Sequence, residues 1–283
     1  MDSIIRFEDF SFRYRDAKRC AVRHLDFEVP EGGFLCVVGP NGSGKSTLCN
    51  ALVGLVPHHF NGKSRGAVRV LGESVAEQTI AQISCHVGFV FQNPFNQLSY
   101  TASTVAEELA YGLGNHGVPR EEMVRRIEQI AAPLHLEGLL DRNPLELSGG
   151  QVQRVALGST LIMNPRVLVL DECTTQLDPL GSEEIFDIVK KLTEDGMTVV
   201  MVDHDMERVA RCADHVLALS RGNQVAFGTP EEVFGNPALE ELGIDIPDYV
   251  RVSRALTEAG LADGAVTLTE GACVERVGKA LGR

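Results

Sequence analysis

The chain has 283 residues and an apolar content of 44%, which is enough to bury the core of one large domain or of two smaller ones. Its formal net charge of -13 disfavours a nucleic-acid partner, because a broad grip on a phosphate backbone needs a basic surface. The seven cysteines form no C-x-x-C pair and no stretch approaches the ~20 apolar residues that span a bilayer, so we expect a protein of the reducing cytoplasm that meets a membrane only through a partner.

Strands and one helix are predicted in the first third of the chain. Apolar and aromatic side chains recur at every second position within residues 4–29, which indicates an antiparallel β region. Residues 34–38 and 87–91 are short apolar runs typical of buried strands. Residues 45–55 are expected to form a helix.

A glycine-rich loop before that helix predicts a phosphate site. Its glycines allow successive backbone N–H groups to point into one concavity, and the helix adds the positive end of its dipole. Lys45 would neutralise the β- and γ-phosphates, and Ser46 would ligate Mg²⁺. The predicted nucleotide-binding residues of the loop are Gly39, Asn41, Gly42, Ser43, Gly44, Lys45, Ser46 and Thr47. A flexible glycine turn is the alternative, and the loop alone would also fit a kinase, a GTPase or a helicase.

Residues 93 to about 165 change character and predict a helical insert. The run at 104–107 fits a capping box, and Pro119 with two glutamates behind it marks the start of a second helix. Residues 148–150 open a third predicted helix over 151–162, and the N-terminus of that helix is a second place where an anion would bind. Two anion sites in one chain suggest ligands shared between subunits.

Two apolar strands, residues 167–170 and 198–202, are predicted to present polar pairs at the C-terminal edge of a parallel sheet. After the first strand, Asp171 would face the Mg²⁺ shell and Glu172 would act as general base on a water in line with the γ-phosphate. After the second, His204 would contact a γ-phosphate oxygen and hold that water. A solvated strand end and a structural histidine are the alternatives for these groups taken singly.

The remaining segments complete the predicted organisation. Gln92 follows a strand and would reach Mg²⁺ or the attacking water, and so report the nucleotide state to the insert; alone it would be a surface amide. A hairpin is expected at 221–227, and Thr229 caps a further helix. We therefore expect one α/β domain at 1–237 and a C-terminal extension without chemical motifs at 238–283.

These elements resemble, in kind and order, the nucleotide-binding subunit of an ATP-binding cassette (ABC) transporter over roughly residues 4–235. The residues that carry the resemblance are the phosphate loop, Gln92, Leu147–Gln151, Val167–Glu172, Asp178 and His204. It implies a P-loop NTPase core with an antiparallel β subdomain, and two subunits that enclose two ATP molecules. It also implies that Tyr14 stacks on adenine, for which a core or exposed strand tyrosine is the alternative. The residues implied to contact the partner's ATP are Ser148, Gly149, Gly150, Gln151 and Asp178.

A narrower resemblance is to the ATPase subunits of energy-coupling factor (ECF) importers, which take up vitamins or transition-metal ions. The residues that carry it are 90–94, 96–97, 105–108, 111–115 and 228–234. It implies that the C-terminal extension helps to join two ATPases. Phe95, Cys173 and Asp203 depart from the family, in which an acidic residue, a proline or alanine, and a threonine are common at these places. His58 and His59 are expected in a loop, where a metal site would need further ligands.

The insert is expected to present a groove to a cytoplasmic helix of a membrane partner, because closure of the ATP sandwich does work only if something attached to the insert moves. The candidate groove residues are Phe95, Leu98, Tyr100 and Tyr111. The alternative is that these side chains pack inside the insert.

The sequence thus predicts an ATP- and Mg²⁺-dependent ATPase at the cytoplasmic face of the membrane, acting as a homodimer or heterodimer that powers import through integral membrane subunits. One rival is a soluble ABC-type ATPase that acts on DNA or ribosomes. Such proteins generally carry a very long coiled coil or two cassettes, and this sequence shows neither pattern. A regulatory nucleotide binder without hydrolysis is the other rival, and the presence of every expected hydrolytic residue disfavours it.

Overall fold

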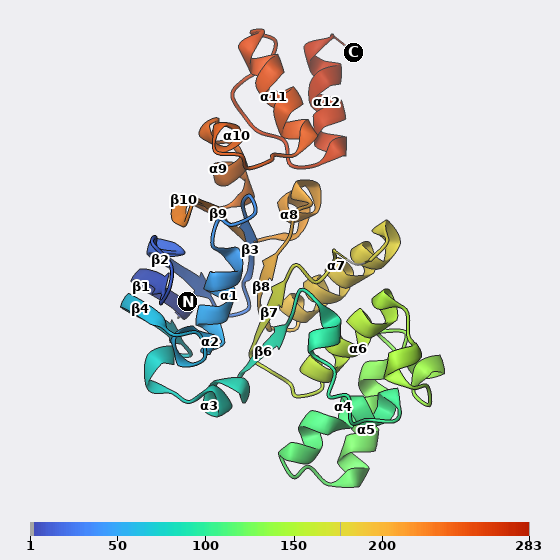
Figure 1. Ribbon diagram of the computed structural model, residues 1–283. Helices are drawn as coiled ribbons and strands as arrows, with labels where there is room; N and C mark the ends of the chain where they lie inside the picture. Colours follow the sequence, from blue (N-terminus) through green and yellow to red (C-terminus); the bar gives the residue numbers. More distant parts are fainter. Residues whose placement is uncertain (1–2, 176, 283) are drawn as a thin grey trace.

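The structure, a computed structural model, describes residues 3–175 and 177–282. Its strands form a single curled sheet in the order β5-β4-β1-β2-β10-β9-β3-β8-β7-β6 (Figure 1). One end of the sheet is antiparallel, as predicted for residues 4–29. The strands of this end are β1 (Ser3–Tyr14), β2 (Val22–Pro30), β4 (Gly62–Val70) and β5 (Glu73–Ser74).

The other end of the sheet is the parallel core. Here β3 pairs in parallel with both β8 and β9, and β7 lies between β8 and β6. Every residue of β3, β7 and β8 is buried, as expected for strands covered on both faces. The predicted α/β, P-loop NTPase fold is confirmed. The parallel strands are β3 (Phe34–Val38), β6 (Val87–Val90), β7 (Val167–Asp171), β8 (Thr198–Val202) and β9 (His215–Ser220), and β10 (Asn223–Gly228) pairs antiparallel with β9.

The two ends of the sheet meet at a narrow seam between β10 and β2. The strands share one residue pair, Asn223 with Arg23. Beyond it, the side chain of Gln224 takes the place of a backbone partner: its Oε1 accepts from the N–H of Asp26 at 2.9 Å, and its Nε2 donates to the Asp26 carbonyl at 3.0 Å. A side-chain amide therefore continues the ladder where the backbone does not.

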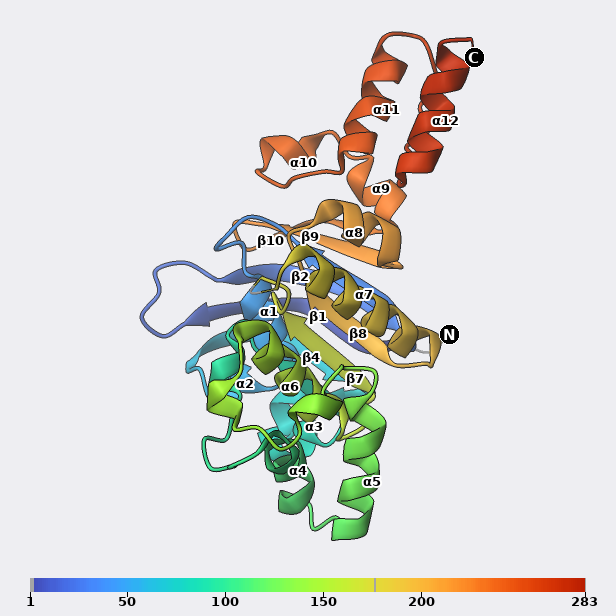
Figure 2. The ribbon, with the colours of Figure 1, turned by 90° about the vertical axis from the view of Figure 1, so that its right-hand side faces the viewer.

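Helices cover both faces of the parallel core (Figure 2). Alternate residues of β3 belong to different hydrophobic clusters, with Cys36 and Val38 on one face and Leu35 and Val37 on the other. The face of Leu35 packs against α1 and the antiparallel strands, and the face of Cys36 packs against the insert and the later helices. The helices outside the insert and the extension are α1 (Lys45–Leu52), α2 (Leu55–His58), α3 (Ile80–Ser84), α7 (Pro179–Glu194), α8 (Met206–Cys212) and α9 (Pro230–Phe234), with a 3-10 turn at Val75–Glu77.

Two local predictions were wrong in this region. The predicted helix at 45–55 is divided, because Gly54 takes a left-handed backbone with φ 74° between α1 and α2. His58 belongs to α2 and not to a loop, and its Nε2 lies 3.1 Å from the carbonyl oxygen of Val75. The geometry thus gives this imidazole a structural partner.

The helical insert is built from three main helices joined by 3-10 turns. The hydroxyl of Thr104 caps α4 by accepting from the N–H of Glu107, but the Glu107 carboxylate accepts from the N–H of Ser103, so the predicted capping box is only half formed. The third helix begins at Gly149, two residues before the predicted start. The elements are Pro94–Asn96 (3-10), α4 (Val105–Asn115), α5 (Arg120–Ala131), Glu137–Leu139 and Pro144–Glu146 (3-10), and α6 (Gly149–Leu161).

The C-terminal extension folds as helices that rise above the sheet at the end opposite the insert (Figure 1). Ile244, Ile246 and Val250 are buried in the same cluster as the β3 residue Cys36, so the base of the extension is continuous with the core. The helices are α10 (Ala238–Glu241), α11 (Asp248–Glu258) and α12 (Glu270–Ala280). Across the described residues, we find no helix with the length and apolar character needed to cross a bilayer.

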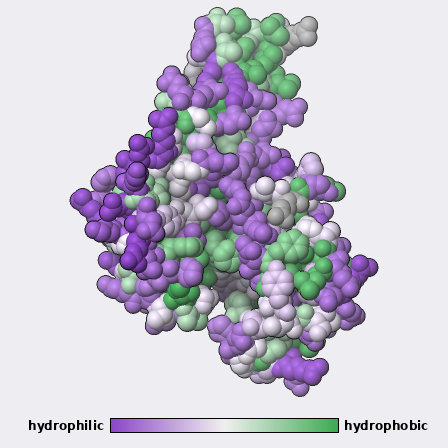
Figure 3. All heavy atoms as spheres, viewed as in Figure 1, coloured by the Kyte–Doolittle hydropathy of each residue, from purple (hydrophilic) through white to green (hydrophobic). Residues whose placement is uncertain are grey.

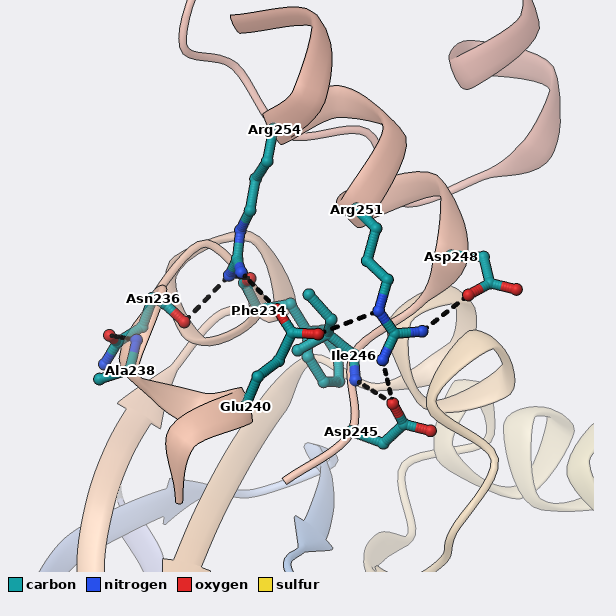
Figure 4. Close-up of polar contacts among 9 residues, drawn as sticks. All are labelled: Phe234, Asn236, Ala238, Glu240, Asp245, Ile246, Asp248, Arg251 and Arg254. Atoms are coloured by element: carbon teal, nitrogen blue, oxygen red, sulfur yellow. Dashed lines mark hydrogen bonds and ion pairs between the residues drawn. The ribbon is translucent and has the colours of Figure 1, made fainter. Parts of the chain in front are cut away.

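Two arginines on α11 fix this base (Figure 4). Arg251 contacts three carboxylates: Glu240 at 3.0 Å, Asp248 at 2.7 Å, and Asp245. Arg254 donates to the carbonyl of Phe234 at 2.6 Å, at the C-terminus of α9. The arginines thereby connect α11 to α10 and to the end of the preceding domain.

Candidate active site

The loop between β3 and α1 has the conformation that its glycines predict. Gly39, Gly42 and Gly44 have φ values of 149°, 75° and 108°. A Cβ at Gly39 would fall 2.1 Å from the carbonyl oxygen of Leu219, and one at Gly44 would fall 2.7 Å from that of Ala21. Both positions therefore require glycine on grounds of space as well as of backbone conformation.

This loop borders a cavity of about 900 Å³, large enough for a nucleotide. The cavity also reaches the loops that follow β6, β7 and β8. Its lining residues are Ala21, Pro40, Asn41, Gly42, Gly44, Lys45, Ser46, Thr47, Gln92, Glu172, Thr175 and His204. The structure thus brings together residues predicted from four separate motifs. Ser43 was predicted to bind nucleotide, but its side chain is only 1% exposed and its backbone N–H donates to the Pro40 carbonyl at 3.1 Å, so neither group is presented to the cavity.

Three predicted residues converge on the carboxylate of Glu172. Gln92 donates from Nε2 to Oε2 at 2.6 Å, and Nε2 of His204 lies 2.9 Å from Oε1. Nζ of Lys45 lies 3.6 Å from the same Oε1 and donates to the Gly39 carbonyl at 2.8 Å. We call Lys45, Gln92, Glu172 and His204 the Glu172 cluster.

Glu172 itself has an uncommon backbone conformation. Its φ is 51°, in the left-handed region that non-glycine residues rarely adopt and that is often associated with functional sites. The turn is held by its neighbours: the Glu172 N–H donates to the Val202 carbonyl at 3.2 Å, and the Thr175 hydroxyl donates to the Glu172 carbonyl at 2.9 Å. Thr175 also lines the cavity and was missed from the sequence, although it follows the predicted general base by three residues.

The adjacent carboxylate, Asp171, is buried at the end of β7. Its Oδ1 accepts a hydrogen bond from the Ser46 hydroxyl at 3.3 Å, so the two predicted Mg²⁺ ligands lie side by side. Burial is the main cause that raises the pKa of Asp171 above its ordinary value, and the charge of Glu172 adds to it, while Ser46 and Lys45 act in the opposite direction. A hydroxyl oxygen beside a desolvated carboxylate suits the oxygen preference of Mg²⁺.

Tyr14 lies at the edge of the phosphate loop. Its hydroxyl is 3.1 Å from Oγ1 of Thr47, and its ring packs edge-on against Phe12 and Phe60. Phe60 is 37% exposed and does not line the phosphate cavity, so the structure gives it only the role of a ring neighbour of Tyr14.

The motif at 147–151 lies at the start of α6. Ser148 and Gln151 form a reciprocal capping box there, and Asp178 caps α7 by accepting from the N–H of Gly181 at 2.7 Å. The described residues that line the phosphate cavity include neither this motif nor Asp178. One chain therefore holds two separate sets of predicted ATP contacts.

Side chains of the insert link the Gln92 loop to α6. Gln97 donates to the Thr160 hydroxyl at 2.7 Å and to the Ala156 carbonyl at 2.8 Å. Leu98 is 7% exposed and packs in the hydrophobic core, so its prediction as an open groove residue was wrong. Tyr100 and Tyr111 are 60% and 49% exposed. Phe95 is partly buried against the same core, and its carbonyl accepts from the Tyr100 hydroxyl at 2.7 Å.

Comparison with known proteins identifies the family. The family model described as "ABC transporter" matches residues 22–175, more than half of the chain. The chain belongs to the ABC transporter family. It is 42% identical over 264 residues to the energy-coupling factor transporter ATP-binding protein EcfA1 of Bacillus licheniformis, and this match covers 92% of the chain and 91% of the relative.

Solved structures of ABC ATPases have the same fold. CbiO1 of Clostridium perfringens, described as part of the ABC transporter complex cbiONQ, superposes with a TM-score of 0.74 at 28% identity, covering 92% of this chain and 98% of CbiO1. The ATP-binding cassette MJ0796, solved as a dimer in a post-hydrolysis state with ADP and phosphate, gives a TM-score of 0.70 at 27% identity and covers 80% and 98% of the two chains.

These matches confirm the resemblances drawn from the sequence. The chain is an ATP-binding ABC ATPase of the energy-coupling factor type, and its ATP hydrolysis is coupled to transport.

Proposed function

We propose that the Glu172 cluster hydrolyses ATP bound on the phosphate loop and that this reaction drives an importer for a vitamin or a transition-metal ion. The convergence of Lys45, Gln92 and His204 on one carboxylate beside the cavity is the observation that carries the proposal. The substrate class comes from the ECF resemblance.

Each residue of the cluster has a role that its position supports. Backbone N–H groups of residues 42 and 44–46 and the α1 N-terminus cradle the phosphates, and the Lys45 ammonium neutralises their charge. Glu172 takes the proton from the attacking water, while His204 holds a γ-phosphate oxygen and that water. Mg²⁺, held by Ser46, Asp171 and Gln92, would neutralise the charge that develops on the phosphates.

We propose that two subunits share their ATP sites. The α6 N-terminus, with Ser148, Gly149, Gly150 and Gln151, together with Asp178 would contact the ATP on the phosphate loop of the other subunit. The separation of these residues from the cavity of their own chain supports this arrangement. ATP binding would then close the dimer, and hydrolysis would reopen it.

Transport would pass through the helical insert to integral membrane subunits, and the protein would then be a peripheral subunit on the cytoplasmic face of the membrane. Tyr100 and Tyr111 are exposed on the insert and remain the candidate contacts. The C-terminal extension is proposed as a subunit interface, which suits the exposed apolar residues gathered near α12 (Figure 3), where Val274 and Leu281 are 64% and 63% exposed.

Substitution Glu172→Gln tests the hydrolytic assignment. Gln keeps the size of the side chain but cannot accept a proton, so turnover should fall by ~100-fold or more while ATP affinity stays within a few-fold of wild type. ATPase rate, nucleotide titration and size-exclusion chromatography with ATP measure these quantities, and closed dimers should accumulate. Glu122→Gln on α5 is the control and should retain wild-type turnover; near-normal turnover of Glu172→Gln would remove Glu172 from the role of base.

A further inference from the structure

The carboxylate of Asp203 is buried beside the Glu172 cluster and accepts three hydrogen bonds. It lies directly after β8 and is 3% exposed. Its Oδ1 accepts from the backbone N–H groups of His204 and Asp205, each at 2.8 Å, and its Oδ2 accepts from the Thr174 hydroxyl at 2.6 Å. Distances of this order are typical of hydrogen bonds to a charged acceptor.

These bonds join the two loops that carry Glu172 and His204. Thr174 follows Glu172 by two residues, after β7, and Asp203 precedes His204, after the neighbouring strand β8. Thr174 is itself nearly buried, and its carbonyl accepts from the Ser182 hydroxyl on α7 at 3.4 Å. The Asp203–Thr174 bond is therefore a cross-link between loops, anchored at both ends in the core.

The position of the His204 side chain depends more on this cross-link than on contacts of the side chain itself. Its side chain is 48% exposed, whereas the Glu172 carboxylate that it meets at 2.9 Å is 12% exposed. The position of the imidazole is thus set mainly by the backbone from which it projects, and Asp203 holds the N–H groups of two residues of that backbone.

We propose that Asp203 is a positioning residue for ATP hydrolysis, which holds His204 against Glu172 through its bond to Thr174. This inference rests on the proposed roles of Glu172 and His204. A carboxylate has two oxygens and serves both loops at once. Asp203 does not line the nucleotide cavity, so it would act through the backbone from which His204 projects.

Thr174→Val is the leading test, because valine keeps the volume of threonine and removes only the hydroxyl. In the full-length ATPase with its partner subunits, we expect kcat to fall ~10-fold or more with KM for ATP within ~2-fold, since the ground-state contacts to ATP are unchanged. Thr174→Ser retains the hydroxyl and should restore kcat. Asp203→Ala should lower kcat at least as much. The double variant Thr174→Val with Asp203→Ala should have the same kcat as Asp203→Ala alone, because both substitutions break the same Asp203–Thr174 bond.

A matched control separates positioning from general destabilisation. Asp214 accepts from the N–H of Phe34 at 2.8 Å at the opposite edge of the same sheet, so Asp214→Asn weakens a comparable contact far from His204. Thermal melts of all variants should show similar losses of stability for Asp214→Asn and Thr174→Val, with kcat preserved only in the former. Equal losses of kcat in both would overturn the inference, as would a loss of ATP affinity in Thr174→Val that matches its loss of kcat.

The benchmark His204→Ala distinguishes this inference from the function on which it rests. If His204→Ala is inactive while Thr174→Val and Asp203→Ala turn over normally, Asp203 is not a positioning residue and the proposed function stands. If His204→Ala itself turns over normally, the role of His204 is wrong, and the inference fails with it.

Discussion

The two carboxylates at the end of β7 are neighbours in sequence but differ in what surrounds them. Glu172 has three polar partners in the Glu172 cluster: the Gln92 amide donates to it, His204 lies within hydrogen-bond distance, and the Lys45 ammonium lies 3.6 Å away. Asp171 has the Ser46 hydroxyl and is otherwise desolvated, which raises its pKa. At the scale of single residues, the site therefore contains one carboxylate with several polar partners and one desolvated carboxylate, and the desolvated one is where a cation is proposed.

We predict that Asp171→Asn stabilises the nucleotide-free protein while abolishing Mg²⁺-dependent hydrolysis. A carboxyl whose pKa is raised by folding holds its proton more readily in the folded state, so its ionisation costs stability above the raised pKa, and this cost is absent below the ordinary value of ~4. Asn removes the cost at neutral pH and can still accept from Ser46.

Thermal melts without Mg²⁺ as a function of pH measure this effect. The midpoint should rise at pH 7, by ~2–4 °C for each 1 kcal/mol relieved, and the difference from wild type should shrink as the pH falls toward 4. A variant that melts below wild type at pH 7 would contradict the prediction. Asp26→Asn on β2, an exposed carboxylate, is the control and should leave the midpoint nearly unchanged.

At the scale of elements, four strands of the parallel core were predicted almost to the residue, because continuous apolar runs such as 34–38 and 198–202 have few other interpretations, whereas β9 at His215–Ser220 was not predicted. The phosphate loop and the four members of the Glu172 cluster were also predicted, since motif spacing fixes the strand edge at which each lies. Contacts set by three-dimensional packing were not: Thr175 lines the cavity and Leu98 is buried for reasons that no local pattern contains.

The position of α6 gives the prediction at the scale of elements, which is that two inactive subunits complement each other. Ser148→Arg should block the site on the partner, and Lys45→Ala should block the site on the subunit's own loop. Each variant alone should hydrolyse ATP very slowly, because both sites of its homodimer are defective. A mixed dimer has one intact site, formed by Lys45 of one subunit and Ser148 of the other, so mixing should restore activity.

ATPase assays on the two purified variants, separately and after co-expression, check this result. Ser84→Arg on α3 introduces the same charge elsewhere and should leave activity unaltered. Dimers that contain both variants yet regain no activity would show that each site is complete within one subunit.

At the scale of the whole molecule, the base of the C-terminal extension lies close to the Glu172 cluster, although no residue of the extension belongs to that cluster. A second cavity, of about 470 Å³, has His204 and Glu172 on one wall and Asp245, Ile246 and Arg251 on another. The Tyr249 hydroxyl also donates to the carbonyl of Glu207 on α8 at 3.0 Å. A displacement of the loop after β8 would therefore displace the residues at the base of the extension.

We predict that Arg251→Ala loosens this base without changing ATP affinity. Removing the guanidinium leaves Glu240, Asp245 and Asp248 without their shared cation, although each contact is partly exposed and salt-screened, so the loss of stability should be ~1 kcal/mol. Limited proteolysis within 238–283 and thermal melts at low and high salt measure it, and the difference from wild type should shrink at high salt. Arg125→Ala, which breaks a pair with Glu122 alone on α5, is the control and should have a smaller effect; equal effects would argue against a network.

The seam between β10 and β2 has a consequence for how the molecule flexes. A ladder of backbone bonds resists shear because each bond is supported by the next, but here one backbone pair, the amide of Gln224 and a ring contact between Phe27 and Phe227 join the two ends of the sheet. We therefore expect the strands that hold Tyr14 to shift against the strands that hold Glu172 more readily at this seam than at any fully paired strand boundary. The phosphate loop lies beside the seam, since the Ser43 carbonyl accepts from the N–H of Gly222 at 3.0 Å.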